Sequence, residues 1–411
     1  MSNNKITYIS GPINLVRIEG KINNFSKVFY FFFDVHLSED FQMECQDLRG
    51  MPIKQFLVKK FDEMKNKNKE YDFFLETFPD FYKIEYPQLG IYLRQLRKLF
   101  SQLFQFDFKK NIALKSPEFP NLRLHYMDIR SYLNSSPGNP FGLRGVIDNY
   151  YNSLNVFYPE DLFKLRDGLN LLAAEIYALH QTIYQNTYQD GKPFLVKENI
   201  SDLSNYTKED YQNIISYIIN KLMKNYQNEV VKQTILNYIN NELFKSFNDF
   251  FTIYDEVQII INKFLPLLEK PLDELVIYKN KTFYQYMIFN AISFQIKAEL
   301  SPKFDELFNI EFTKIKMVIM DLYFLRRALD KNYITNGIIY TGAAHSVFYI
   351  NFIIKYFDFE ITNLSYGKYD INDINEDIKT KNLSETEQSE ILYPNKLTQC
   401  INISSFPNLF D

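Results

Sequence analysis

Histidines are rare in this chain of 411 residues, and two of the four stand where an apolar, strand-like segment ends. His36 closes the sequence Asp34-Val35-His36, and His345 closes Gly342-Ala343-Ala344-His345. A third apolar run ends in Glu76. Imidazoles and carboxylates together can bind a divalent metal or carry out acid–base chemistry. Because the carboxyl ends of parallel strands line one crevice of an α/β sheet, we expect these residues to share one site.

The first motif places a carboxylate beside an imidazole. Asp34 and His36 are two positions apart, so a continuing strand presents both side chains on one face. Asp34 could then orient His36 as a base or bind a metal with it. The alternative is a surface pair at a strand end. The preceding segment Phe31–Phe33 indicates a strand end that is buried on both sides, which favours a pocket.

The late motif indicates a strand that passes directly into a helix. The strand is expected to end at Thr341, and Gly342 with two alanines leaves room for a close backbone approach. His345 would then lie in the first helical turn, where the helix dipole disfavours its cationic form. A neutral imidazole is the form that a metal ligand or general base requires. The alternative is a histidine that merely fills the helix start.

Three further polar residues follow strand-like runs. Glu76 comes directly after the run 71–75 and is a candidate general base or metal ligand, with a solvated strand-terminal charge as the alternative. Asp128 and Arg130 alternate after the run 122–127. Such a pair more often orders a site than reacts, but Arg130 would suit the stabilisation of developing negative charge.

The remaining histidines favour structural roles. His125 lies inside the run 122–127 and is expected to pack in the core behind the site. His180 follows leucines spaced by three and four residues, the pattern of a helix packing seam. We therefore expect His180 to be a satisfied or edge histidine of that helix.

The two cysteines are far apart and predict neither a disulfide framework nor a cysteine metal site. A reducing compartment is the simpler interpretation. The acidic neighbours of Cys45 disfavour its thiolate, which argues against a nucleophile pair with His36. The first residues lack the apolar segment of a secretory signal, and the apolar stretch 343–357 is too short to span a bilayer. We expect an intracellular, cytoplasmic protein.

Charge and motifs restrict the partners. The formal charge is −4 and no long basic stripe is present, which disfavours nucleic-acid binding. The sequence contains no phosphate-binding glycine loop, zinc-protease helix motif or serine elbow. Haem is disfavoured because no attachment motif occurs. A small molecule or peptide remains as the expected ligand, and a homo-oligomer is compatible with the sequence.

The order of strand-like and helix-like segments predicts an α/β fold with a mostly parallel central sheet, flanked by helices and interrupted by a large helical insertion. The expected parts are residues 1–140 and 331–411 as two halves of the α/β domain, with 141–330 as the insertion. The acidic segment 366–394 is expected to be a mobile loop. It lacks the glycine that a calcium-binding loop requires at its sharp turn.

These motifs resemble the erythromycin esterase, ChaN, TraB and Tiki superfamily. In that group a first strand ends in an acidic residue and a histidine, a second ends in glutamate, and a late Gly-x-x-His opens a helix. Asp34 with His36, Glu76, and Gly342 with His345 match these positions. The resemblance covers roughly residues 26–130 and 335–360. It departs at Phe33, where the group usually has glycine, and at Asp34, where it often has glutamate.

The resemblance implies a hydrolase of ester or peptide bonds with a histidine–carboxylate site. Glu76, His345, Asp34, Arg130 and Asp128 are the candidate catalytic residues. The candidate ligands of a divalent metal, Mn or Zn, are His36, His345, Glu76 and Asp34. Activities in the superfamily range from ester hydrolysis and metal-dependent peptide cleavage to haem binding and none demonstrated, so the fold transfers better than the reaction.

The competing hypothesis is a non-catalytic binding or structural protein, such as a virion or host-interaction component, with a degenerate site. Phe33 favours it, because a bulky side chain in place of glycine could fill the pocket. The abundance of Asn, Lys and Tyr also resembles proteins of large DNA viruses. For a viral protein, the expected location is the host cytoplasm or the virion.

Overall fold

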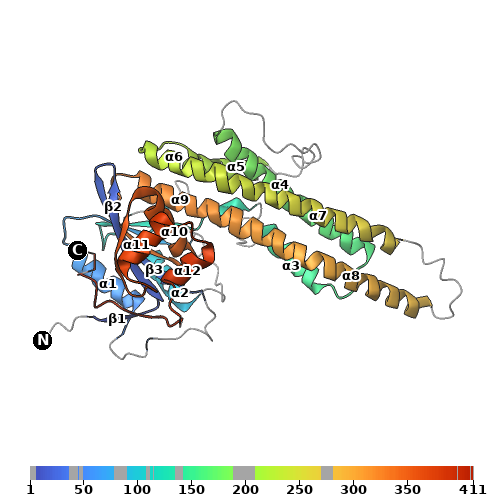
Figure 1. Cartoon of the computed structure of the whole chain (residues 1–411), viewed down its shortest axis with the longest axis horizontal. Helices are drawn as coiled ribbons and strands as arrows, with labels where there is room; N and C mark the ends of the chain where they lie inside the picture. The colour runs from blue at the N-terminus through green and yellow to red at the C-terminus, as the bar shows by residue number, and fades with distance from the viewer. Residues whose placement is uncertain are drawn as a thin grey trace. The chain divides into compact units, whose positions relative to one another are not determined.

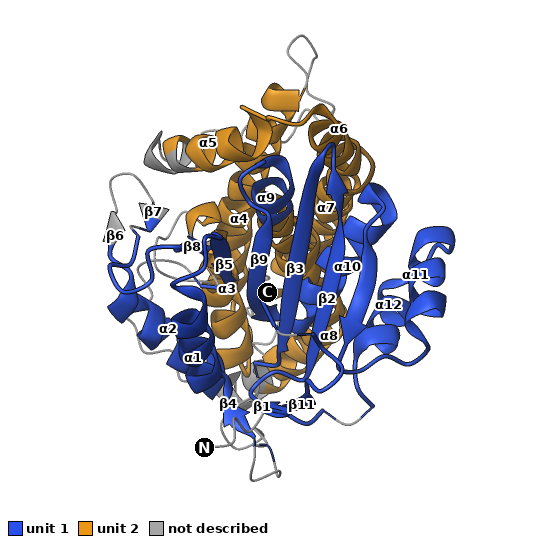
Figure 2. Ribbon diagram, turned by 90° about the vertical axis from the view of Figure 1, so that its left-hand side faces the viewer, with its two compact units in different colours: residues 1–128, 323–411 blue, residues 129–322 orange. Residues whose placement is uncertain are grey.

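The computed structural model describes residues 6–36, 45, 50–77, 90–107, 112–113, 115–134, 142–187, 209–269, 281–395, 397–407 and 409–410. They form two compact units, drawn in different colours in Figure 2. The first unit combines residues 1–128 with 323–411, and the second spans 129–322. The sequence predicted the boundaries at 140/141 and 330/331. Both boundaries lie earlier in the chain. The first falls after Asp128, so the 3-10 turn Arg130–Leu133 belongs to the second unit. The second falls after Leu322, inside the helix Met317–Asp330, so the end of that helix belongs to the first unit.

A mixed sheet forms the centre of the first unit. Within the described residues it has six strands in the order β10-β2-β3-β9-β5-β8. The pairs β3–β9, β9–β5 and β5–β8 are parallel, whereas β10–β2 and β2–β3 are antiparallel. The predicted α/β class is confirmed. The strands are β2 (Asn14–Ile22), β3 (Phe25–Asp34), β5 (Tyr71–Leu75), β8 (Leu122–Tyr126), β9 (Asn336–Gly342) and β10 (Glu360–Leu364).

Alternation along β3 gives the sheet two apolar faces. Tyr30 and Phe32 belong to the core cluster that includes the buried sides of α1 (Ile53–Met64) and α2 (Ile91–Leu103). Phe31 faces the other side and contacts Phe324 of α9 (Met317–Asp330) and Tyr349 of α10 (Ala343–Phe357). A strand buried on both sides is what the phenylalanine run predicted.

Two short helices and a small sheet complete this unit (Figure 1). The acidic segment expected to be a mobile loop instead forms α11 (Ile371–Thr380) and α12 (Glu385–Leu392). Ile374 and Ile378, one helical turn apart, are buried and hold α11 in place. A three-stranded sheet has the order β11-β1-β4, and a separate pair is formed by β6 and β7. Their bounds are β1 (Tyr8–Ser10), β4 (Met51–Pro52), β6 (Phe106–Asp107), β7 (Ile112–Ala113) and β11 (Cys400–Asn402).

The cysteine prediction is wrong, because Cys45 and Cys400 form a disulfide with their Cα atoms 4.7 Å apart. The antiparallel pairing of β1 with β11 places Cys400 opposite Ser10 and so returns the C-terminal segment to the start of the chain. Sequence separation gave no sign of this pairing. The argument for a reducing compartment that rested on unpaired cysteines therefore no longer holds.

The second unit is helical, as expected for the insertion. Leucines of the predicted seam are buried along α4, where His180 is also buried among Tyr184, Phe244 and Phe247. Burial lowers the pKa of His180 to about 4, which fits a structural histidine. None of the described helices has the length and apolarity that a membrane span requires. Its helices are α3 (Gly142–Ser153), α4 (Pro159–Thr187), α5 (Glu209–Met223), α6 (Glu229–Tyr238), α7 (Phe244–Glu269) and α8 (Lys281–Asn309), with π-helical turns at Ile239–Leu243 and Ile310–Lys316.

Candidate functional site

Four of the predicted residues meet at the carboxyl end of the parallel strands: Asp34, His36, Glu76 and His345. Asp34 ends β3 and pairs in register with Gly342, the last residue of β9. Glu76 follows β5, and its backbone N–H donates to the carbonyl of Tyr340. His345 lies in the first turn of α10, which starts directly after β9. The topology therefore joins segments that are up to 311 residues apart (345 minus 34) in one place.

The Glu76 carboxylate lies between the two histidines. Nε2 of His36 is 3.4 Å from Oε2 of Glu76, and Nε2 of His345 is 3.4 Å from Oε1. Oε2 also accepts hydrogen bonds from the Thr341 hydroxyl at 2.9 Å and from the Gly342 backbone N–H at 2.5 Å. The two β9 donors fix the carboxylate, whereas the imidazoles stand at the outer limit of hydrogen-bond distance.

Asp34 orients His36 from the opposite side. Its Oδ2 is 2.7 Å from Nδ1 of His36, and its Oδ1 accepts a hydrogen bond from the Tyr340 hydroxyl at 2.8 Å. Asp34 is fully buried, while the His36 side chain is 29% exposed. A carboxylate on Nδ1 fixes the ring orientation and leaves Nε2 to act. Asp34 is thus a positioning residue for His36 in this arrangement.

Gly342 is required by a close approach and not by its backbone angles. A Cβ at this position would lie 3.1 Å from Oε2 of Glu76 and 3.3 Å from Nε2 of His36. These distances are tighter than ordinary contacts, so a larger residue would push the carboxylate and the imidazole away. The glycine of the Gly-x-x-His motif therefore has a local physical reason.

Opposite charges within this cluster shift the pKa values of His36 and Glu76 away from their usual values. Desolvation disfavours the charged imidazole of His36, but the negative charge of Glu76 and hydrogen bonds to Asp34 and Glu76 raise its pKa to about 10. Desolvation likewise opposes the Glu76 carboxylate, but His345 and His36 hold its pKa well below the usual range. At neutral pH the cluster therefore contains an anionic Glu76 beside a cationic His36.

The arrangement does not fit a ligand shell for a resident metal. In the part of the chain that the structure describes, no group of three or more His, Cys, Asp or Glu side chains is placed to hold a metal ion. The physical reason is that both oxygens of Asp34 face His36 and Tyr340, and the two Nε2 atoms face different oxygens of Glu76. These side chains face one another instead of one shared coordination point.

The other candidates have different environments. The backbone N–H of Asp128 donates to the carbonyl of Thr77, the residue after Glu76, so Asp128 lies near the site. Arg130 belongs to the second unit, where its guanidinium lies 5.5 Å from the ring centre of Phe312. His125 is not a simple core residue, because its Nε2 is 2.7 Å from Oδ1 of Asp72.

Two features of the site were not predicted. Tyr340 and Thr341 supply hydroxyl donors to Asp34 and Glu76, and the only signal was two polar groups in an otherwise apolar run before Gly342. Under the competing hypothesis of a degenerate site, Phe33 could fill the pocket. Its ring instead packs against Tyr393, and by alternation it lies on the opposite face of β3 from Asp34.

Comparison with known proteins shows the family of the chain. Residues 7–411 match the model described as "Family of unknown function (DUF5847)". The chain belongs to this family. It is 31% identical to the uncharacterized protein R706 of Acanthamoeba polyphaga mimivirus, over 98% of this chain and 96% of that protein. The uncharacterized mimivirus proteins R161 and R160 are each 30% identical, over 98% of both chains. No solved structure matches the chain.

Proposed function

We propose that the chain is a hydrolase of ester or peptide bonds whose acid–base centre is the cluster of His36, Glu76 and His345. The observation that carries the proposal is the Glu76 carboxylate, held by β9 between the Nε2 atoms of two histidines. Each Nε2 atom stands 3.4 Å from this carboxylate, at the outer limit of hydrogen-bond distance. Two loosely held imidazoles around one buried carboxylate resemble the paired acid and base of a catalytic site.

The residues suit distinct roles in such a reaction. The water oxygen would bond to the carbonyl carbon, and its proton would pass to the His345–Glu76 pair. The leaving oxygen or nitrogen would take its proton from Nε2 of His36, which is cationic at neutral pH. Asp34 keeps this nitrogen in position through Nδ1. Before it gives up this proton, the same cation would stabilise the negative charge that develops on the carbonyl oxygen as water adds.

A metal-dependent version uses the same residues. Manganese or zinc bound by His36, His345 and Glu76 would require these side chains to turn away from one another toward a common ion. Elemental analysis of the purified protein separates the two versions. Stoichiometric metal that is lost in His345→Ala would support the metal version, and metal-free protein that hydrolyses a substrate would contradict it.

The test of hydrolysis uses matched histidine variants. The full chain is assayed with p-nitrophenyl acetate, p-nitrophenyl butyrate and a quenched fluorescent peptide library. Glu76→Gln and His345→Gln are expected to lower kcat by about 100-fold or more, the usual range for acid–base catalysis. His125→Gln, which changes another buried histidine–carboxylate pair, is the control and should keep kcat. Equal rates for Glu76→Gln and the wild type would contradict the proposal.

A non-catalytic binding or structural role is the second candidate. The observation that favours it is how firmly Glu76 is held. The Thr341 hydroxyl and the Gly342 backbone N–H both donate to its Oε2, as they would to a purely structural carboxylate. The mimivirus relatives support a place for this protein in the host cytoplasm or the virion. Partners in either case would be a small molecule, a peptide or further copies of the chain.

A further inference from the structure

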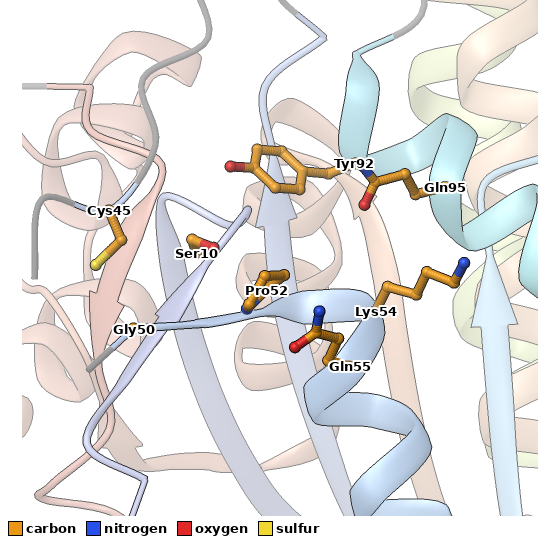
Figure 3. A pocket seen from close by; sticks show the side chains of 8 residues that line it. All are labelled: Ser10, Cys45, Gly50, Pro52, Lys54, Gln55, Tyr92 and Gln95. Atoms are coloured by element: carbon orange, nitrogen blue, oxygen red, sulfur yellow. The ribbon is translucent and has the colours of Figure 1, made fainter. Parts of the chain in front are cut away.

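A cavity of about 270 Å³ lies in the first unit beside the Cys45–Cys400 disulfide. Its walls come from β1 and from the first turns of α1 and α2, together with Cys45. Figure 3 shows Tyr92 and Gln95 above the space, Lys54 and Gln55 below it, and Ser10 toward the disulfide. This volume is near the lower end of ligand sites, so it suits a small molecule or one group of a larger one.

The polar side chains around this cavity have no partners of their own. Ser10, Lys54, Gln55 and Gln95 form no side-chain hydrogen bond or ion pair in the described structure. Ser10 is only 6% exposed, and its hydroxyl lines the cavity. A ligand or water in the cavity would satisfy this hydroxyl. Lys54 and Gln95 are half-buried and Gln55 is exposed, so Ser10 is the one deeply placed polar group of these four.

The charges around the cavity favour an anion. Of the described residues that line it, Lys54 alone is charged, and no carboxylate is among them. The helices α1 and α2 both begin here, and neither N-cap residue, Pro52 or Gly90, caps its helix with a side chain. Neither first turn contains an acidic residue. The backbone N–H groups of these first turns, at the positive ends of two helices, would add to the charge of Lys54.

We propose that this cavity binds a small ligand through an anionic group, a phosphate or a carboxylate. Lys54 would provide the charge, and the Ser10 hydroxyl with the amides of Gln55 and Gln95 would donate hydrogen bonds. The proposal holds whether or not the histidine cluster is catalytic, because none of its residues lines the cavity.

The cavity is nevertheless linked to that cluster. Tyr92 and Tyr340 are buried in the same core cluster of the first unit, and the Tyr340 hydroxyl donates to Asp34 at 2.8 Å. Asp34 in turn holds His36. A ligand in the cavity would thus contact Tyr92, which belongs to the same buried cluster as the tyrosine that holds Asp34.

The test is a calorimetric titration of the full chain at low ionic strength with two probes, inorganic phosphate and succinate. We expect at least one probe to bind one-to-one with a Kd of about 1 mM or below. Binding of phosphate alone identifies a phosphate site, and binding of succinate alone identifies a carboxylate site. Failure of both to bind would overturn the proposal.

Two lysine variants of α1 distinguish this site from general charge attraction. Lys54→Met is expected to weaken binding by about tenfold, the cost of losing one charge-assisted contact. Lys59→Met is the matched control, because Lys59 is exposed on the same helix and does not line the cavity. It should change the Kd by less than about twofold. Equal weakening by both variants would contradict the site.

Ser10→Val, which fills the space without changing charge, should also abolish binding, and unchanged binding would overturn the assignment.

Discussion

The two ends of strand β5 each carry a buried carboxylate beside histidine, but the two groups differ in geometry. At the amino end, Asp72 accepts from Arg123 at 2.8 and 2.7 Å and contacts His125 at 2.7 Å. At the carboxyl end, Glu76 stands 3.4 Å from each of its histidines. The first group is a closed, bidentate ion pair. The second has imidazoles at the outer limit of contact, which leaves them able to engage another molecule.

The same residue type also carries different charge at the two ends. Burial lowers the pKa of His125 well below its usual value, and the positive charges of Arg327 and Arg123 lower it further. At His36, two carboxylates outweigh desolvation and raise the pKa to about 10. Burial together with nearby cations thus keeps His125 neutral, whereas nearby carboxylates make His36 cationic. A strand-end histidine does not by itself indicate a reactive site.

The largest expected effect is loss of stability at the amino end. Asp72→Ala would leave Arg123 with only the exposed Glu70 and the Tyr333 carbonyl, and would leave His125 without its carboxylate, so the free energy of unfolding should fall by about 3 kcal/mol. Urea denaturation of the full chain measures this. Asp62→Ala is the control, since Asp62 forms an exposed pair with Lys65 and should cost less than about 0.5 kcal/mol. Similar losses in the two variants would show that Asp72 is not a closed structural pair.

A smaller effect is expected from crowding the carboxyl end. In Gly342→Ala the new methyl group would lie against Glu76 and His36, and overpacking of this kind costs about 1–2 kcal/mol. Hydrolysis, where it is detected, should fall more than stability does. Ala344→Ser changes an exposed neighbour and serves as the control. A Gly342→Ala protein with unchanged stability and unchanged His36 titration would contradict the close approach.

The smallest expected effect is on the pH dependence of stability. It should show that His36 is stabilised as a cation and Glu76 as an anion in the folded chain. His36 has a raised pKa in the folded state, so its contribution is complete below the unfolded value near 6.5 and is lost as pH rises toward 10. Glu76 has a lowered pKa, so its contribution is lost as pH falls below about 4.5. Because His36 is partly exposed, we expect a loss of roughly 1 kcal/mol between pH 6.5 and 10. The stability of His36→Gln, measured by denaturation at several pH values, should not fall in this way. The same fall in both proteins would show that a group other than His36 causes it.

The sequence predicted the carboxyl end better than the amino end for a physical reason. Parallel strands share one edge for their carboxyl ends, so Asp34, Glu76 and His345 could be grouped without knowing the strand order. The Asp72 group requires that order, because Asp72 meets Arg123 only when β5 lies beside β8. Its signal was a charged residue inside an apolar run, which is ambiguous without a partner strand.

Other parts of the structure depended on long-range pairing or on weak periodicity. The Cys45–Cys400 disulfide follows from the β1–β11 pairing, and no local pattern indicates that pairing. In α11 the two buried isoleucines are four residues apart, but the surrounding acidic residues hid this helical spacing. The strong alternation of β3 and the leucine seam of α4 were predictable, because each contains many apolar residues at one period.

The central claim is that the Glu76 carboxylate governs the charge of His36. Nuclear magnetic resonance titration of the histidine ring protons in the wild-type chain and in Glu76→Gln tests it most directly, with His36→Gln to assign the His36 signals. We predict that His36 stays protonated well above pH 7 in the wild type and that its pKa falls substantially in Glu76→Gln. A His36 ring that titrates near 6.5 in both proteins would contradict the account.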